Sequence, residues 1–324
     1  MNKFLLSVII PTYKRNQKLK KIINQLMRQS PLGIKIEIII IGDIYQNIGF
    51  FLKNLIKKKN IEIKVLKAKK NSNAIKRNIG IDNAKGKYLI LLDDDCLPDQ
   101  NFLKDYLPLL KKINDKEILC GSVRYLNSKI KMKNFTHYRQ SRHFISVNKY
   151  ISRKNTLPAS NIVTMNMGMK NSKLLEKTKY FHKDFGGYGF EDYEFGFRLI
   201  RNGFIFLPSK PTVYHLDHRD YKSYLNKIYF LSRYSVISLK KINYQSWENT
   251  IYFKIENNFF VNFFSKNKII YSLIEIIEKL IEFTERNIFL YLPKLYRFGI
   301  FLSYCRGYYD RKGLTKHKNY DWYK

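Results

Sequence analysis

The sequence predicts an α/β fold built on a parallel β-sheet, followed by a mainly helical C-terminal region. Two observations carry this prediction. In the first 95 residues, continuous apolar runs of strand length alternate with segments of helical periodicity, which is typical of parallel strands covered on both faces. Beyond Tyr221 the apolar residues recur mainly at helical spacing. We therefore expect one domain over 1–220 and a helical region, rich in basic and aromatic residues, over 221–324.

Each element of the first 95 residues has a local signal. Near-continuous apolar runs predict strands at 4–10, 36–41, 61–66 and 88–92. Apolar residues at helical spacing predict helices over 18–29, 50–58 and 74–83. Pro11 ends the first run, because proline has no N–H group to donate to a neighbouring strand.

The rest of the chain gives more varied signals. We expect helices over 101–113 and 191–202, and strands over 118–125 and 204–207. A basic and aromatic segment over 131–150 is consistent with either a mobile loop or a helix. The clearest helical pattern covers 268–286, where isoleucines and leucines lie opposite four glutamates.

The charge balance is strongly basic, since 60 Lys and Arg against 26 Asp and Glu give a formal net charge of +34. Such a surplus favours a polyanionic partner, such as nucleic acid, an anionic membrane face or a phosphorylated ligand. Residues 221–324 hold 18 basic and 8 acidic residues, a surplus of 10, so no polybasic tail stands out. A/T-rich codons, which enrich Lys, Asn, Ile, Tyr and Phe together, explain the surplus equally well.

Composition excludes several classes of protein. Hydrophobic residues make up 45% of the 324 residues, which excludes wholesale disorder. The three cysteines lie far apart, which excludes a disulfide framework and indicates a reducing compartment. No window approaches the roughly 18 to 20 apolar residues that a membrane span needs, and no secretory signal is visible. We therefore expect a cytoplasmic protein.

Polar residues follow three of the predicted strands: Thr12, Asp43 and the triple aspartate Asp93–Asp95. Because ligands bind beyond the carboxyl ends of parallel strands, these residues point to one cleft. Three adjacent carboxylates repel one another, and oxygen ligands of this density suit Mg²⁺ or Mn²⁺ together with substrate phosphates. A solvated acidic turn is the alternative interpretation.

A glycine-rich and aromatic segment, FGGYGFED at 185–192, places two acids at the start of a predicted helix. The glycines permit close backbone approach to a ligand, the aromatic rings can stack on a sugar, and an acid here can act as a general base. The alternative is that these acids complement the helix dipole. His215, which follows a short strand, is a candidate third metal ligand.

Together with the helical motif AIKRNIG at 74–80, these features resemble family 2 of the glycosyltransferases with the GT-A fold, over roughly 5–218. The resemblance implies a Rossmann-like sheet that binds a nucleotide sugar. It assigns donor contacts to the first turn, to the acid after the second strand, to an Arg-Asn pair and to two of the three aspartates. These residues are Pro11, Thr12, Tyr13, Arg15, Asp43, Arg77, Asn78, Asp93 and Asp94.

The resemblance also implies a metal site and a catalytic base. Mn²⁺ or Mg²⁺ is expected on Asp95, with Asp93 and His215 as further ligands. The Gly-Glu-Asp segment resembles that of galactosyl-, N-acetylgalactosaminyl- and chondroitin-type transferases. This resemblance makes Asp192, beside Glu191, the base. It also assigns acceptor contacts to three residues, Gly187, Tyr188 and Gly189, of which Tyr188 stands where the family often has Trp.

The implied reaction is an inverting transfer. The hydroxyl of a glycan, glycolipid or polypeptide acceptor attacks the anomeric carbon of a nucleotide sugar, with UDP as the expected nucleotide, while a metal neutralises the leaving diphosphate. Two alternatives stay open: a basic nucleic-acid-binding protein and a metal-dependent nucleotidyltransferase. The first lacks any helix-turn-helix, zinc or RNA-recognition signature, so we expect no nucleic-acid partner. The second would prefer nucleoside triphosphates.

Two C-terminal segments bear on membrane contact. The predicted helix over 268–286 has a Glu-rich polar face, which favours packing against the protein body or a second subunit. The run 291–324 combines Tyr and Phe with Lys and Arg, a composition that suits the headgroup boundary of an anionic membrane. We expect weak peripheral association with the inner membrane face through this run.

Overall fold

The structure is a computed structural model. It describes residues 4–29, 33–44, 48, 52, 58–125, 134–142, 156–186, 188–216, 220–258, 269–286 and 290–311. The chain forms two compact units. The first comprises Met1–Leu126, Arg142–Lys183 and Phe195–Asp217, and the second comprises Asn127–Ser141, Asp184–Glu194 and His218–Lys324. The expected boundary at residue 220 stays a prediction about domains.

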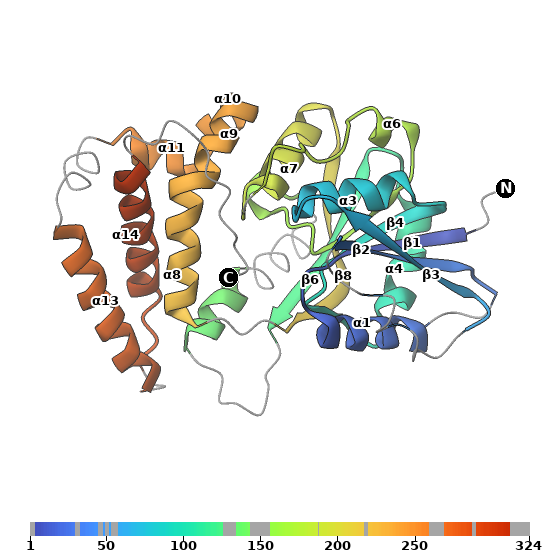
Figure 1. Ribbon diagram of the computed structural model, residues 1–324, viewed down its shortest axis with the longest axis horizontal. Helices are drawn as coiled ribbons and strands as arrows, with labels where there is room; N and C mark the ends of the chain where they lie inside the picture. Colours follow the sequence, from blue (N-terminus) through green and yellow to red (C-terminus); the bar gives the residue numbers. More distant parts are fainter. Residues whose placement is uncertain are drawn as a thin grey trace. The chain divides into compact units, whose positions relative to one another are not determined.

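An eight-stranded sheet forms the centre of the first unit, in the order β3-β2-β1-β4-β7-β6-β8-β5 (Figure 1). The first four strands in this order are parallel, and β7 and β5 each run antiparallel to their neighbours. The strands are β1 (Phe4–Pro11), β2 (Ile36–Asp43), β3 (Ile61–Ala68), β4 (Gly86–Leu92), β5 (Cys96–Pro98), β6 (Glu117–Tyr125), β7 (Asn166–Lys170) and β8 (Ile205–His215). The expected α/β class is therefore confirmed.

Helices cover both faces of the parallel strands (Figure 1). On one face, α1 (Asn16–Arg28) and α4 (Phe102–Lys112) share a buried apolar cluster with alternate residues of β1, β2 and β4. On the other face lies α3 (Asn73–Asp82), which packs so closely that a Cβ atom on Gly80 would lie 2.3 Å from Ile9 Cγ2. The remaining helical segments are η1 (Ala159–Asn161), α6 (Lys173–Glu176) and α7 (Glu191–Arg201), and α7 spans the division between the units.

The structure corrects the expected strand over 204–207. β8 instead runs unbroken for 11 residues through Pro208 and Pro211 and pairs parallel with β6. Its register shifts opposite Gly121, and the Asn166 amide donates to the backbone oxygens of Ser122 and Pro211, both at 3.0 Å. The Asn166 side chain thus satisfies two backbone oxygens where the register of the ladder shifts. The predicted helix over 50–58 lies almost entirely outside the described residues.

Beyond residue 220 the described part of the second unit is mainly helical, which confirms the mainly helical C-terminal region. Its helical segments are 134–142, α8 (Tyr221–Phe230), η2 (Leu231–Ser235), α9 (Val236–Ile242), α10 (Tyr244–Glu248), α11 (Ile251–Glu256), α13 (Ile269–Arg286) and α14 (Pro293–Arg311). α14 lies between α8 and α13 (Figure 1). Buried Glu256 joins three elements of this unit, because it accepts from Lys240, Tyr304 and Arg311 at 2.9, 2.6 and 2.5 Å.

The basic and aromatic run over 291–324 is largely a packed helix where it is described. Tyr296 is 1% exposed within the apolar cluster of α13 and α14, and Arg311 is buried, whereas Arg297 and Phe298 are exposed. Among the residues that the structure describes, none of the helices combines the length and the hydropathy that crossing a membrane requires. Peripheral membrane contact stays a prediction, and Lys312 onward lies outside the described residues.

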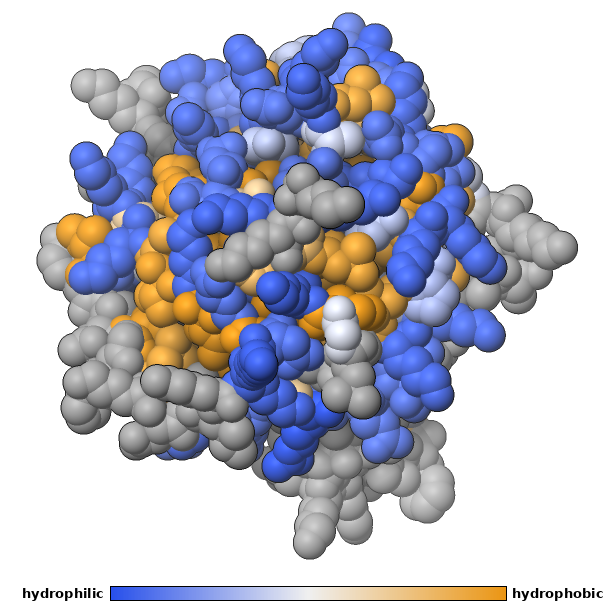
Figure 2. All heavy atoms as spheres, turned by 90° about the vertical axis from the view of Figure 1, so that its right-hand side faces the viewer, coloured by the Kyte–Doolittle hydropathy of each residue, from blue (hydrophilic) through white to orange (hydrophobic). Residues whose placement is uncertain are grey.

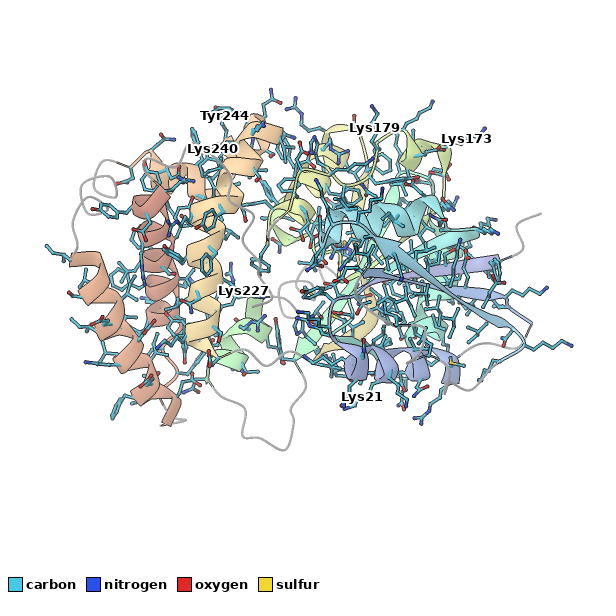
Figure 3. All side chains as sticks on the ribbon, viewed as in Figure 1. Lys21, Lys173, Lys179, Lys227, Lys240 and Tyr244 are labelled. Atoms are coloured by element: carbon cyan, nitrogen blue, oxygen red, sulfur yellow. The ribbon has the colours of Figure 1, made fainter. Side chains whose placement is uncertain are left out.

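Positive charge is spread over many elements of the chain. Lys21 on α1 and Lys173 on α6 extend from opposite edges of the first unit, and further labelled lysines lie on α8 and α9 (Figure 3). Hydrophilic side chains cover much of the face shown in Figure 2, with apolar side chains between them.

A buried carboxylate fixes the edge of the sheet at which β1, β2 and β4 begin. Glu37 is 1% exposed, and its Oε1 accepts hydrogen bonds from Ser7 Oγ, Lys85 N and Gly86 N at 2.6, 2.5 and 3.1 Å. Glu37 thereby ties the starts of three adjacent strands together. Its register partner on β3, Glu62, is exposed.

Glu37→Ala should destabilise the protein strongly, because it leaves these buried donors without their acceptor. We expect a loss of about 2–4 kcal/mol in the free energy of unfolding, measured by urea denaturation. Glu62→Ala, on the neighbouring strand, should change it by less than about 0.5 kcal/mol. Equal losses in the two variants would contradict the role given to Glu37.

Candidate active site

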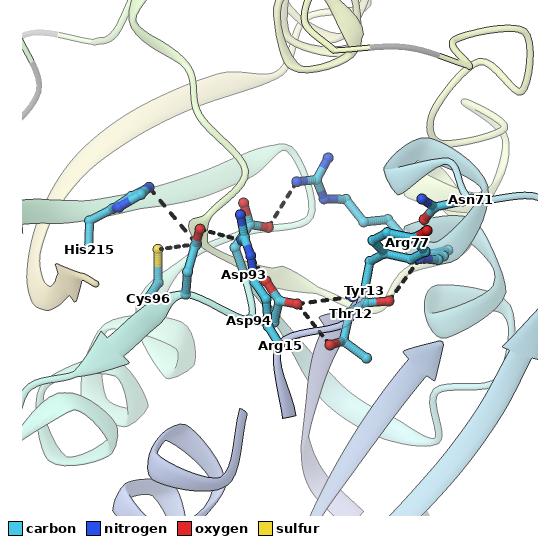
Figure 4. Close-up of polar contacts among 11 residues, drawn as sticks. Thr12, Tyr13, Arg15, Asn71, Arg77, Asp93, Asp94, Cys96 and His215 are labelled. Atoms are coloured by element: carbon cyan, nitrogen blue, oxygen red, sulfur yellow. Dashed lines mark hydrogen bonds and ion pairs between the residues drawn. The ribbon is translucent and has the colours of Figure 1, made fainter. Parts of the chain in front are cut away.

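The strand ends bring the predicted polar residues together at one edge of the sheet. β1 ends at Pro11 and pairs with β2, which ends at Asp43, while β4 on the other side leads directly into the triple aspartate. Asp43 and Thr12 are buried, at 8% and 2% exposure. Figure 4 shows the polar contacts that link the turn after β1 to these carboxylates.

Asp94 is held by the turn after β1. Its Oδ2 accepts from Thr12 Oγ1 at 2.8 Å and from Tyr13 N at 3.1 Å, and its Oδ1 accepts from Arg15 Nη1 at 2.9 Å (Figure 4). Burial raises the pKa of Asp94, while Arg15 and the two hydrogen bonds oppose this effect. The same Arg15 Nη1 also forms an ion pair with Asp95 Oδ2. One guanidinium therefore serves two adjacent carboxylates.

The two residues of the Arg-Asn pair on α3 make different contacts. Arg77, 2% exposed, donates from Nη2 to Asp93 Oδ1 at 2.9 Å (Figure 4). Asn78 instead binds the backbone of Phe181: its Nδ2 donates to the carbonyl at 2.7 Å and its Oδ1 accepts from the amide at 3.0 Å. The geometry therefore gives Arg77 a place beside the carboxylates and gives Asn78 a packing role.

The short strand β5, which we did not predict, brings His215 to the triple aspartate. β5 pairs antiparallel with β8 so that Cys96 lies opposite His215, and Leu216 N donates to Asp95 O at 2.7 Å. His215 Nε2 consequently lies 3.9 Å from Asp95 Oδ1, and Cys96 Sγ lies 3.7 Å from the same oxygen (Figure 4). Asp95 and His215 are 120 residues apart in the sequence, and apart from the resemblance to the family no local pattern predicted this contact.

The donor atoms around Asp95 fit a divalent cation in part. Atoms of Asp95, Cys96 and His215 lie within 4.8 Å of one another, and all three residues are buried. Burial raises the pKa of the Cys96 thiol well above its usual range, so it stays protonated and is a poor ligand for a hard cation. A carboxylate oxygen and an imidazole nitrogen remain, which suit Mn²⁺ when substrate phosphates complete the shell.

The glycine-rich segment belongs to the second unit up to Glu194. Gly189 and Phe190 have φ of 90° and 71°, a sharp turn directly before α7, whose first turn holds Glu191, Asp192 and Glu194. Tyr188 is 37% exposed, with Lys227 Nζ 4.4 Å from its ring centroid. Gly187 lies outside the described residues. The turn thus presents an aromatic ring and the start of an acidic helix within a few residues.

Lys76 is a site residue that the sequence reasoning missed. It is 0% exposed, and its Nζ donates to Thr12 O at 2.8 Å and to Asn71 Oδ1 at 2.6 Å. Burial lowers its pKa to about 8, although Asp43 and Asp94 favour the charged form. The sequence offered one indication of this role, because Lys76 belongs to the AIKRNIG motif and lies on the buried side of that helix. Lys76 fastens the turn that holds Asp94.

Lys76 should make stability depend on pH. Because the pKa of Lys76 is lower in the folded than in the unfolded chain, the unfolded chain binds more protons between about pH 8 and 10.5, and stability rises over that window. Relative to Lys76→Met, the wild type should gain up to about 3 kcal/mol in its free energy of unfolding from pH 7.5 to 10.5. Urea denaturation of both proteins checks this, and parallel pH profiles would contradict it.

Comparisons with known proteins identify the family of this chain. Residues 7–176 match the model of glycosyl transferase family 2. The poly(ribitol-phosphate) β-N-acetylglucosaminyltransferase TarP of Staphylococcus aureus is 32% identical over 117 residues, which cover 36% of this chain and 35% of TarP. This chain thus matches about a third of TarP's length.

A second relative, from Methanococcus voltae, is 26% identical over 61% of this chain and 62% of its own. It is the dolichyl N-acetyl-α-D-glucosaminyl phosphate 3-β-D-2,3-diacetamido-2,3-dideoxy-β-D-glucuronosyltransferase. S. aureus TarS 1–349 in complex with UDP-GlcNAc aligns with a TM-score of 0.46 and 14% identity, over 94% of this chain and 90% of TarS 1–349. The family model covers more than half of the chain and confirms the expected family: the chain belongs to glycosyl transferase family 2.

Proposed function

We propose that this glycosyltransferase moves an acetamido sugar from a UDP-sugar to an acceptor hydroxyl, with inversion at the anomeric carbon and with the help of Mn²⁺ or Mg²⁺. The observation that carries the proposal is the triple aspartate at the carboxyl edge of a parallel sheet, beside His215. The two relatives support the choice of sugar, because both of their names specify acetamido sugars in β linkage.

The contacts of the first unit support a donor site. Arg77 and Arg15 are guanidinium groups that suit diphosphate oxygens, and Asp93 and Asp43 offer acceptors for ribose hydroxyls and the base. Asp95 and His215 would hold the cation, whose chemistry is to neutralise the charge that develops on the leaving diphosphate. Asp93, the further ligand expected from the sequence, pairs with Arg77 and is not among the grouped donor atoms. Thr12, Tyr13 and Lys76 keep Asp94 in place. We assign no donor contact to Asn78, because its side-chain amide is hydrogen-bonded to the backbone of Phe181.

Asp192 is the base in this proposal. Its position in the first turn of α7, directly after the turn at Gly189 and Phe190, supports the role, and Asp192 is half-buried there, whereas Glu194 of the same turn is buried. Tyr188, with its exposed ring, and Gly189 are the proposed acceptor contacts, together with Gly187 on the sequence pattern alone. A net charge of +34 further supports an acceptor with phosphate or other anionic groups.

A donor scan tests the proposal. The purified chain is incubated with Mn²⁺, poly(ribitol phosphate) or a neutral oligosaccharide, and one of UDP-GlcNAc, UDP-GalNAc, UDP-glucose or the four nucleoside triphosphates. We expect release of UDP from an acetamido sugar donor, and EDTA should abolish it. Pyrophosphate release from a nucleoside triphosphate would instead establish nucleotidyl transfer. Tight, salt-dependent binding of generic DNA without any turnover would favour the nucleic-acid-binding alternative.

Asp192→Asn should separate catalysis from donor binding. The variant keeps the shape of the side chain and removes the proton acceptor, so transfer should fall roughly 10²- to 10⁴-fold while the Kd for UDP stays unchanged. Glu191→Gln should cost much less, and Glu248→Gln on α10, an exposed residue, is the charge-matched control. A larger loss in Glu191→Gln would transfer the role of base to Glu191.

A further inference from the structure

Arg15 occupies an unusual position for a donor-binding residue, because it pairs with a proposed metal ligand. Its Nη1 contacts Asp95 Oδ2 and lies 2.9 Å from Asp94 Oδ1. The other oxygen of Asp95, Oδ1, faces His215 and Cys96. The carboxylate of Asp95 is thus shared between a guanidinium on one side and potential metal ligands on the other.

The backbone directs Arg15 into this place. Lys14 adopts φ 53°, a left-handed conformation that is unfavourable for a non-glycine residue, and so turns the chain between β1 and α1. Arg15 then stands directly before α1, and its carbonyl accepts from Leu19 N at 3.0 Å. A strained turn at this point indicates that the position of Arg15 is enforced by the surrounding structure.

Exposure distinguishes Arg15 from the second guanidinium of the site. The side chain of Arg15 is 22% exposed, whereas Asp94 and Asp95 beneath it are 7% and 8% exposed. Arg77 is 2% exposed beside Asp93, whose side chain is 23% exposed. Arg15 therefore lies on the solvent side of its carboxylates, where a ligand arrives, while Arg77 is fixed beneath its partner.

Building on the proposed function, we propose that Arg15 is an exchangeable counter-cation: it competes with a divalent metal for Asp95 and transfers to the diphosphate of the donor when that metal binds. Arg15 and Arg77 leave the triple aspartate with one net negative charge. A divalent cation together with the two charges of a donor diphosphate preserves that balance, whereas the cation alone would leave a surplus of positive charge around Arg15. A guanidinium released from Asp95 suits phosphate oxygens, which it can bind through two parallel hydrogen bonds.

The proposal predicts opposite changes in two affinities. In Arg15→Gln, Mn²⁺ should bind more tightly than in the wild type when no nucleotide is present, because its competitor for Asp95 is gone. UDP, titrated in the presence of Mn²⁺, should bind more weakly, because the diphosphate loses a guanidinium. A charged hydrogen bond contributes about 1.5–3 kcal/mol, so each change should be roughly 10- to 100-fold. A role in folding alone would not strengthen metal binding.

Isothermal titration calorimetry measures both affinities, and the electron paramagnetic resonance signal of free Mn²⁺ confirms the first. Lys21→Gln, at an exposed residue of α1, is the charge-matched control and should leave both affinities unchanged. Arg15→Lys keeps the charge without the planar fork, so it should retain weak metal binding and lose UDP affinity. This variant also serves as the test if Arg15→Gln does not fold by circular dichroism.

The outcomes separate the two proposals. If the wild type binds both Mn²⁺ and UDP but Arg15→Gln binds Mn²⁺ equally or less tightly, the exchange role is wrong and the donor site stands. Unchanged UDP affinity in Arg15→Gln also overturns the exchange. If the wild type binds neither ligand, the proposed function fails, and the role of Arg15 fails with it.

Discussion

Three carboxylates side by side at the edge of a sheet repel one another, and the surroundings of the triple aspartate follow from the need to neutralise them. Arg15 reaches it from the turn after β1, and Arg77 reaches it from α3. Lys76, buried on the same helix, fastens the turn that holds Asp94. These cations come from the turn after β1 and from α3, both distant from the aspartates in the sequence. The acids can therefore be buried only when β1, α3 and β4 are assembled correctly.

The two edges of the parallel strands use buried charge differently. Where the strands begin, Glu37 is buried and accepts three hydrogen bonds that lock β1, β2 and β4 in register. Where the strands end, guanidinium groups form ion pairs with the carboxylates, and one of these groups, that of Arg15, is partly exposed. One edge is therefore held by a structural carboxylate, whereas the other combines carboxylates with a guanidinium that is partly exposed.

The sequence predicted the parts of the fold that depend on local periodicity. The first four strands lie at or within a few residues of the predicted runs, because β1, β2 and β4, buried on both faces, are almost wholly apolar, and the edge strand β3 alternates apolar and charged residues over most of its length. It did not predict β5 or the full length of β8. The three residues of β5 pair with β8, and β8 continues through two prolines beside Asn166, whose amide binds backbone oxygens of both β6 and β8. Both depend on contacts between segments far apart in the sequence.

In the candidate site, too, local patterns predicted some features, whereas contacts between distant segments decided the others. Motifs located the acids and Arg77, since residue type and strand ends suffice for that. They did not reveal Lys76 beneath the turn, the contact of Asn78 with the Phe181 backbone, or the sharing of Asp95 between Arg15 and His215. Each of these is decided by the direction in which a side chain points once the helix has packed. Sequence patterns name the chemical groups of a site, and packing decides which of them meet.

The central claim is that the triple aspartate forms a joint site for a metal and a diphosphate. The most direct measurement is the affinity of the wild-type protein for Mn²⁺ with and without saturating UDP, by isothermal titration calorimetry. The account predicts that UDP tightens Mn²⁺ binding by about tenfold or more, and that Mn²⁺ tightens UDP binding by the same factor, because coupling between two ligands is reciprocal. Equal Mn²⁺ affinity with and without UDP, or UDP binding that EDTA leaves unchanged, would contradict it.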